Sequence, residues 1–398
     1  MKQKFIKKQK GITLVALVVT IVILLILVGI TIMYTMGDNS IFKKAQEAKN
    51  KTEDAIKNEQ EYMNSIDNML NEHINGNTTK DETVADIVDK VQVNNKTVKD
   101  ENGNKVVIPG GFKVVPDTNS NDVDYTYSGD KKPCVQDGIV IEDEDKNQFV
   151  WIPIGDIKNK DDTVTTITLG RYIFNTGSWD STNQKYTGTG EETLVQSAQN
   201  YTKIVNLRPE GLSYDFQELV NSSNNISAKN LGDFVNKTNI NGEYYLARYE
   251  ISQGTDEKAK SQADKTAWVD IIQKDAAMIA REMYNNNYIE SDLINSYSWD
   301  TAIVFIQKYS GNSNYAIRTA INTNKLNTGK SGDKVCNIHD MASNCREWST
   351  EYSLRSENPC VYRGGRYSYA SNYTSDRYSD TTIGKLDDFS FRSILYLK

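Results

Sequence analysis

The chain has 398 residues, a formal net charge of −7 and a pI of about 5.2, with apolar residues making up 38% of it. This length predicts two or three domains rather than one small one. Five lysines in the first ten residues form its one strongly basic stretch, so the composition gives no electrostatic basis for a nucleic-acid partner.

The N-terminus combines this basic stretch with a long apolar run. Residues 1–11 hold the lysines, and residues 12–33 carry no charge. About 20 apolar residues are enough for a helix to span a bilayer, and flanking lysines keep the near end in the cytoplasm. We therefore predict a transmembrane helix at 12–36 in a single-pass protein of the cell membrane whose C-terminal part is extracellular. The other interpretations are an ordinary signal anchor and a cleaved secretory signal.

The stretch KGITLVALVV at 10–19 resembles the leader of type IV prepilins. In that family a prepilin peptidase cuts after the glycine and the new N-terminus is methylated, which implies cleavage between Gly11 and Ile12. Ala16 stands where members usually carry a glutamate that helps subunits assemble. The resemblance thus implies the peptidase as a partner, and it leaves open a filament of pilin-like subunits.

Polar and helical patterns follow the apolar run. Apolar residues recur at a spacing near 3.5 over residues 38–74, which predicts an amphipathic helical stalk at 37–75. This stalk is either a continuation of the membrane helix or a plain coiled coil, and both would hold the rest of the chain away from the membrane. Residues 76–104 are polar and predict a linker with one short helix at 82–91.

From residue 105 the pattern predicts an α+β domain. Short runs of Val, Ile, Phe and Trp bounded by Gly, Pro, Asp or Asn indicate strands, and EDEDKN at 142–147 indicates a hairpin turn. Another strand is predicted at 242–252, and helices at 265–286 and 296–311. Residues 155–240 are rich in Thr, Asn and Gly, so we expect a loop-dominated insertion there.

Three ordered segments carry a second resemblance. They are IHDMASNCREWSTE at 338–351, CVYRGGRYSY at 360–369 and DDFSFRSILYL at 387–397. They resemble the Asp-Met-x-Gly-Asn-x-x-Glu-Trp, Arg-Gly-Gly and Gly-Phe-Arg motifs of the formylglycine-generating-enzyme (sulfatase-modifying factor) type of C-type lectin fold. Ser343 and Ser390 replace glycines of those motifs. The resemblance implies a loop-rich C-type-lectin-like domain over 105–398.

The catalytic groups of the related enzymes are missing from the sequence. No cysteine follows Gly364, whereas the oxidases of this type need a reactive pair there. His73 and His339 are the two histidines, too few for the His-x-x-x-His-x-Glu cluster of the iron-dependent relatives. We therefore predict a binding domain that is not an enzyme and has no redox cofactor. The alternatives are an oxidase of this type and a structural minor pilin.

The same resemblance implies a Ca²⁺ site on the first motif. Its ligands would be the side chains of Asp340 and Glu347 and the carbonyl groups of Ser343 and Cys345. Glu347 would otherwise cap the chain or pair with an arginine. The resemblance also implies neighbouring strands joined by a Cys345–Cys360 disulfide, while Cys134 and Cys336 either pair or stay free.

Residues 364–380, GGRYSYASNYTSDRYSD, combine Tyr and Ser with Asn and Asp. Tyrosine provides large, rigid contact area, and the small polar residues provide adaptable hydrogen bonds. We predict a recognition face for a protein or glycan ligand, formed by Arg366, Tyr367, Tyr369, Asn372, Tyr373, Asp376, Arg377, Tyr378 and Asp380. The segment resembles the variable region of proteins diversified by a diversity-generating retroelement. The alternative is a tyrosine-rich loop whose rings pack on the domain.

Overall fold

A computed structural model divides the chain into two units, residues 1–79 and 80–398. It describes residues 18–25, 49, 52, 82–115, 135–182, 185–209, 212–219, 227–369 and 371–398. Residues 18–25 are helical and exposed, and within the described ranges no helix has both the length and the apolar character that a membrane span requires. The predicted leader, the Gly11–Ile12 cleavage site, most of the predicted membrane helix and nearly all of the stalk lie outside the described residues.

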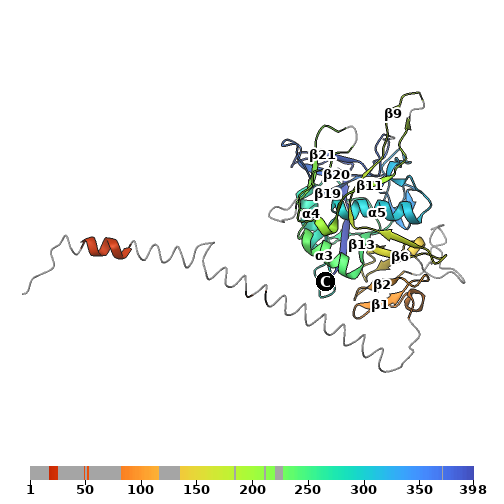
Figure 1. Ribbon diagram of the computed structural model, residues 1–398, viewed down its shortest axis with the longest axis horizontal. Coiled ribbons are helices and arrows are strands. Elements are labelled where there is room, and N and C mark those ends of the chain that lie inside the picture. The colour runs from red at the N-terminus through yellow and green to blue at the C-terminus, as the bar shows by residue number, and fades with distance from the viewer. Residues whose placement is uncertain are drawn as a thin grey trace, which may run out of the picture. The chain divides into compact units, whose positions relative to one another are not determined.

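The second unit is mixed α+β, as predicted, and strands dominate it (Figure 1). Its α-helices are α3 (Leu231–Asn241), α4 (Gln273–Glu282) and α5 (Ser296–Tyr309). Its 3₁₀ helices are η1 (Val84–Ile87), η2 (Val135–Asp137), η3 (Ala198–Asn200) and η4 (Tyr315–Ile317). Its strands are β1 (Lys96–Lys99), β2 (Lys105–Ile108), β3 (Lys113–Val114), β4 (Val140–Glu142), β5 (Gln148–Pro153), β6 (Gly155–Lys158), β7 (Val164–Ile167), β8 (Gly170–Phe174), β9 (Trp179–Asp180), β10 (Lys185–Tyr186), β11 (Glu192–Ser197), β12 (Phe216–Glu218), β13 (Glu243–Ala247), β14 (Ser252–Gln253), β15 (Ala259–Lys260), β16 (Ile289–Leu293), β17 (Lys334–Val335), β18 (Ile338–His339), β19 (Arg346–Ser353), β20 (Cys360–Arg363), β21 (Arg377–Asp380), β22 (Phe389–Phe391) and β23 (Ser393–Leu397).

Two larger sheets organise these strands. One is six-stranded in the order β16-β23-β13-β5-β4-β3, and its β4–β5 hairpin turns at 142–147 as the sequence predicts. The other is five-stranded, with the path β12-β19-β20-β21 and β22 pairing with β19 in parallel. Helix α5 contacts β5 of the first sheet and β19 of the second. Every residue of α5 from Ser296 to Gln307 is buried, so this helix forms part of the common core.

Helix α4 begins later than the pattern predicts. We expected a helix over 265–286, but it runs only from Gln273 to Glu282. The chain before it is extended, because Ala267 bridges Ser252 and the amide of Trp268 donates to the carbonyl of Ile251 at 2.7 Å. Trp268 and the two isoleucines that follow it therefore belong to a packed loop rather than to a helical stripe.

The predicted linker at 76–104 is corrected from residue 82 onward. Strand β1 pairs with β2, and Val98, Val106 and Ile108 of this hairpin are buried in the main hydrophobic core. The side chain of Asp100 closes the turn by accepting from the amide of Asn104 at 2.7 Å. The sequence pattern did not predict strand β1 because most of its residues are polar and a single apolar side chain, that of Val98, reaches the core. The predicted short helix is present as η1.

The predicted loop-dominated insertion at 155–240 contains regular structure instead. It holds the β6–β7 hairpin, the β8–β11 pair, the β9–β10 pair and α3, and its β12 joins the second sheet beside β19. In β7 and β11 all residues but one are exposed or half-buried. Antiparallel strands with one solvated face carry few apolar residues, so the Thr- and Asn-rich composition did not predict them.

We expect Ile108→Ala to lower the free energy of unfolding of the second unit by about 2–5 kcal/mol, because it leaves a cavity under a fully buried strand residue. Val93→Ala, at a side chain that is 83% exposed, is the control and is expected to change it by no more than about 0.5 kcal/mol. Chemical denaturation of both variants measures this. Equal, negligible effects would show that residues before 109 are a linker after all.

A buried carboxyl group ties the N-terminal hairpin to the first sheet. Glu243 of β13 is 1% exposed. It accepts hydrogen bonds from Trp151 Nε1 at 2.6 Å and from the amide of Val107 at 3.1 Å. Burial raises the pKa of Glu243 to about 8, and these hydrogen bonds oppose the rise only in part.

This carboxyl group makes stability pH-dependent. Since the pKa of Glu243 is higher in the folded state, folding takes up a proton there. Its stabilising contribution is therefore complete below its ordinary pKa of 4.5 and is lost as the pH rises through about 8. We expect the free energy of unfolding to fall over that window, and Glu243→Gln to flatten the fall, in denaturation series at several pH values. Glu101→Gln, at an exposed site, is the control, and an equal flattening by both variants would contradict the assignment.

Candidate functional site

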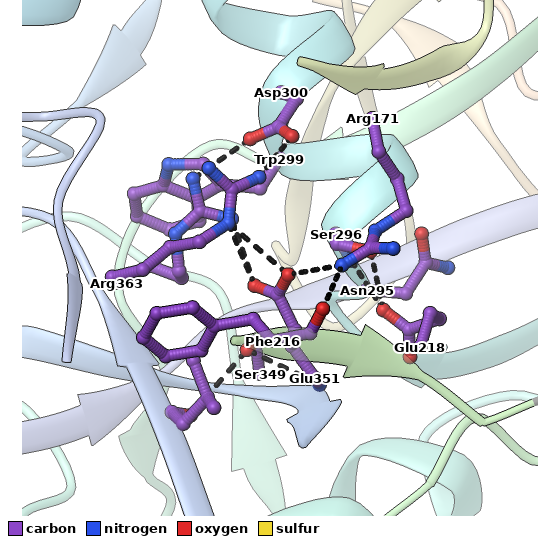
Figure 2. A network of polar contacts seen from close by, with 12 residues as sticks. Arg171, Phe216, Glu218, Asn295, Ser296, Trp299, Asp300, Ser349, Glu351 and Arg363 are labelled. Atoms are coloured by element: carbon purple, nitrogen blue, oxygen red, sulfur yellow. Dashed lines mark hydrogen bonds and ion pairs between the residues drawn. The ribbon is translucent and has the colours of Figure 1, made fainter. Parts of the chain in front are cut away.

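Three arginines and two carboxylates meet in the interior, and each comes from a different element (Figure 2). They are Arg171 of β8, Arg363 of β20, Arg377 of β21, Asp300 of α5 and Glu351 of β19. Glu351 accepts from Arg171 Nη2 at 2.8 Å and from Arg377 Nε at 3.0 Å. Asp300 accepts from Arg363 Nη2 at 2.7 Å and also from Arg377 Nη2. These five side chains are 0–2% exposed, and we call them the arginine network.

The arginine network keeps Glu351 ionised. Burial alone would raise the pKa of Glu351, but the guanidinium groups of Arg377, Arg171 and Arg363 outweigh burial and hold that pKa below its ordinary value. The neighbouring Glu218 behaves in the opposite way. Burial and the charge of Glu351 raise its pKa, although Ser296 and Thr350 donate hydrogen bonds to it.

The arginine network also joins residues 364–380, which we call the terminal segment, to β8. Arg377 Nη1 donates to the carbonyl of Tyr172 at 3.1 Å, and the Tyr172 amide donates to Asp300 at 2.8 Å. Arg363 Nε donates to the carbonyl of Asp376 at 2.9 Å. Guanidinium groups suit this task because their planar forks bind several acceptors at fixed angles. Each nitrogen of the Arg377 guanidinium thus donates to a group inside the protein, and contact between Arg377 and a ligand stays a prediction.

A groove lies where these two regions meet, with a cavity volume of ≈ 460 Å³. Its first wall is Ile173, Phe174, Thr176, Gly177 and Ser178, from β8 and the turn after it. Pro209 and Leu212 from the chain before β12 also line it. Its second wall is Ser371, Tyr373, Ser375, Asp376, Arg377 and Tyr378 of the terminal segment. Figure 1 places the β9 hairpin at the same end of the unit as β20 and β21.

The sequence predicted only the second wall of this groove. Tyr373, Asp376 and Tyr378 line it as expected, with Tyr373 5% exposed and Tyr378 half-buried. The first wall comes from the region at 155–240 that was expected to be a loop-dominated insertion. In the sequence of this wall, Ile173 and Phe174 follow Arg171 closely and give only a weak indication of a strand. No local pattern in these residues indicates that they lie beside the terminal segment.

The other predicted recognition residues lie outside the groove lining. Tyr369 is 45% exposed, and the Arg366 guanidinium lies 4.1 Å from its ring centre. Arg366 also pairs with Asp388 at 2.6 Å, while Tyr367 is half-buried. We call Arg366, Tyr367 and Tyr369 the outer face. Asp380 ends β21 and accepts from the Thr381 amide.

Asn372 is an internal residue rather than a surface one. It is 5% exposed, accepts from Arg346 Nη2 at 3.2 Å and donates to Asp376 Oδ2 at 3.2 Å. The amide of Tyr373 donates to the same Asp376 oxygen at 2.9 Å. Burial raises the pKa of Asp376 to about 6, although these hydrogen bonds and the charges of Arg363 and Arg346 lower it.

The predicted calcium ligands are engaged within the protein. Glu347 forms a buried ion pair with Arg392 at 2.6 Å, so the alternative that this glutamate pairs with an arginine is confirmed. Asp340 accepts from Ser331 Oγ at 2.5 Å and from the Gly329 amide at 2.6 Å. The described part of the chain holds no group of three or more His, Cys, Asp or Glu side chains arranged for a metal ion. Calcium binding at this motif stays a prediction.

The predicted Cys345–Cys360 disulfide is wrong, because both thiols are free. Strands β19 and β20 are neighbours as expected, but their register places Cys360 opposite Tyr352, while Cys345 precedes the other end of β19. At about 3.3 Å per residue the two cysteines are too far apart along the strand to bond. Burial raises the pKa of both thiols, that of Cys360 to about 12. Cys134 lies outside the described residues, so whether Cys134 and Cys336 pair stays a prediction.

No protein-family model and no curated protein matches the chain. Among solved structures it is similar to the crystal structure of CarF, at 13% identity and a TM-score of 0.29, over 39% of this chain and 87% of that one. It is also similar to the M1 and U1 variants of Major Tropism Determinant, at 11% and 12% identity and TM-scores of 0.26, over 79% of this chain and 98% of theirs. TM-scores this low do not assign a fold family.

We expect Glu351→Gln to destabilise the second unit by about 3–5 kcal/mol, because it leaves three buried guanidinium groups without their shared counter-ion. Glu357→Gln on the nearby exposed loop is the matched control and is expected to be neutral. Thermal and urea unfolding measure both. A loss below about 1 kcal/mol at Glu351 would mean that the ion pairs contribute little to the stability of the folded state.

Proposed function

We propose that the second unit is a ligand-binding module, not an enzyme, and that the groove between the terminal segment and β8 is its recognition site. The observation that carries this proposal is the lining of the groove. Tyrosine, phenylalanine and leucine side chains alternate there with Ser, Thr and a single Asp, in a cavity of ≈ 460 Å³. Apolar and aromatic walls with a few placed polar groups are typical of binding pockets.

Pre-organisation supports the proposal. The arginine network holds β21 and β8 in place beneath the groove, so a ligand meets walls that are already ordered. Rigid aromatic contact surfaces lose little conformational entropy on binding. The outer face next to the groove would add adaptable contacts through Tyr367 and Tyr369.

The motifs that suggest a C-type-lectin-like fold of the formylglycine-generating type have structural roles that fit this module. Arg363 and Arg392 form buried ion pairs with Glu351 and Glu347. Gly364 has a φ of +80°, and a Cβ on Gly364 would collide with the carbonyl oxygen of Met341. These residues support a scaffold role in which the motifs carry no chemistry.

Diversification by a retroelement is part of the proposal for selected positions only. Tyr367 and Tyr369 are accessible enough to vary without disturbing the core. Asn372 and Arg377 are buried in hydrogen-bond and ion-pair networks, so substitutions there would cost stability. A genomic template repeat that differs from the coding sequence at adenines, and spares the Arg377 codon, would support this part.

Surface display is proposed from the sequence of the first unit alone. The basic leader, the apolar run at 12–33 and the Gly11–Ile12 junction suggest a prepilin-type anchor that presents the module outside the cell membrane. Co-expression with a prepilin peptidase, followed by mass spectrometry of the N-terminus, tests this. An unprocessed chain would leave the binding module unaffected and remove the pilin-like part.

The groove is tested with the purified full-length chain on protein and glycan arrays. For any ligand found, we expect Tyr378→Ala to weaken binding by about tenfold or more, because it removes an aromatic wall of the groove. Tyr288→Ala, at a half-buried tyrosine outside the groove lining, is the control. Ligands whose affinity is the same for both variants and the wild type would place recognition elsewhere.

A further inference from the structure

Among the described residues that line the groove there is one carboxylate, and the one basic side chain is engaged within the protein. Arg377 is the basic side chain in its lining, and its donors go to Glu351, Asp300 and the carbonyl of Tyr172. Asp376 is the acidic one. The described lining therefore offers Asp376 no basic side chain of its own, and a basic group of a ligand could pair with it.

The described residues donate hydrogen bonds to one oxygen of Asp376. Asn372 and the amide of Tyr373 both donate to Oδ2. Among the described residues, no donor reaches Oδ1. The positive charges of Arg363 and Arg346 act on this carboxylate, and burial still prevails over them in setting its pKa. A partly desolvated carboxylate with a vacant oxygen gains more from a cation than from a neutral hydroxyl group.

The surroundings of Asp376 also suit a cation. Tyr373 and Tyr378 line the same groove, and tyrosine rings attract ammonium and guanidinium groups. Ser375, 6% exposed, has an Oγ with no hydrogen-bond partner among the described residues. Phe174 and Leu212 on the facing walls can cover the aliphatic stem of a basic side chain.

We propose that the groove selects a basic group, an ammonium or guanidinium carried on an aliphatic stem, through Asp376 and its neighbouring tyrosines. This inference rests on the groove being the recognition site. The group would come from a Lys or Arg side chain of a partner protein or from a free organic cation such as agmatine.

The test uses the purified full-length chain at low ionic strength and a matched pair of pentapeptides, one with a central Arg and one with citrulline, which has the same shape without the charge. Calorimetry or ligand-observed NMR gives each affinity. We expect the Arg peptide to bind more tightly by about tenfold, the usual scale of one charge-assisted hydrogen bond. Agmatine as an additional probe separates the two sources, since tight agmatine binding indicates a free cation.

Asp376→Asn should abolish the preference for Arg over citrulline while keeping an acceptor for Asn372 and Tyr373. Asp380→Asn removes the same charge four positions away, outside the groove lining, and should keep the preference. In the wild type the preference should also vanish as the pH is lowered through about 6, where Asp376 takes up a proton. This second readout needs no variant to fold.

Equal affinities for the Arg and citrulline peptides, or an equal loss from both Asp→Asn variants, would overturn the assignment of a basic ligand. An array ligand that depends on Tyr378 but not on Asp376 would also overturn it, and would leave the groove as the binding site. If no ligand depends on Tyr378, the proposed function itself fails.

Discussion

The structure depends on the burial of three guanidinium groups among two carboxylates. Desolvating any of these charges alone would be very unfavourable, so each residue is restricted to positions where the others neutralise it. Arg171, Arg363 and Arg377 come from three different strands, and Asp300 and Glu351 come from a helix and a fourth strand. The constraint therefore fixes how β8, β19, β20, β21 and α5 lie relative to one another, which the hydrophobic core alone would specify less sharply.

The groove is a consequence of that constraint. Because Arg377 reaches the backbone of Tyr172, the terminal segment must lie beside β8, and the groove opens between them. A second buried pair, Glu347 with Arg392, fixes the other end of β19 in the same manner. The motif residues Arg363 and Arg392 thus connect elements inside the protein through buried ion pairs. Tyr373, Asp376 and Tyr378 line the groove and form the surface that a ligand would meet.

The residues of the terminal segment fall into two groups, one held in the interior and one more accessible to solvent. Asn372 and Arg377 are held in the interior by hydrogen bonds and ion pairs, while Tyr367 is half-buried and Tyr369 is exposed. Substitutions at Tyr367 or Tyr369 should therefore disturb the fold less than substitutions at Asn372 or Arg377, because the buried ion pairs and hydrogen bonds belong to the latter. Asp376 is partly buried. Its carboxylate accepts hydrogen bonds from Asn372 and the amide of Tyr373, and it also lines the groove.

The sequence by itself determined the α+β class, the hairpin turn at 142–147, the strand at β13, helix α5 and the tyrosine-rich wall of the groove. These follow from local patterns of apolar residues and turn residues, which act over a few positions. Only the tertiary structure decided the register that separates Cys345 from Cys360, the inward direction of Arg377 and the second wall around Phe174. The physical reason is that pairing between strands far apart in the chain, and the neutralisation of buried charges, depend on partners that no local pattern specifies.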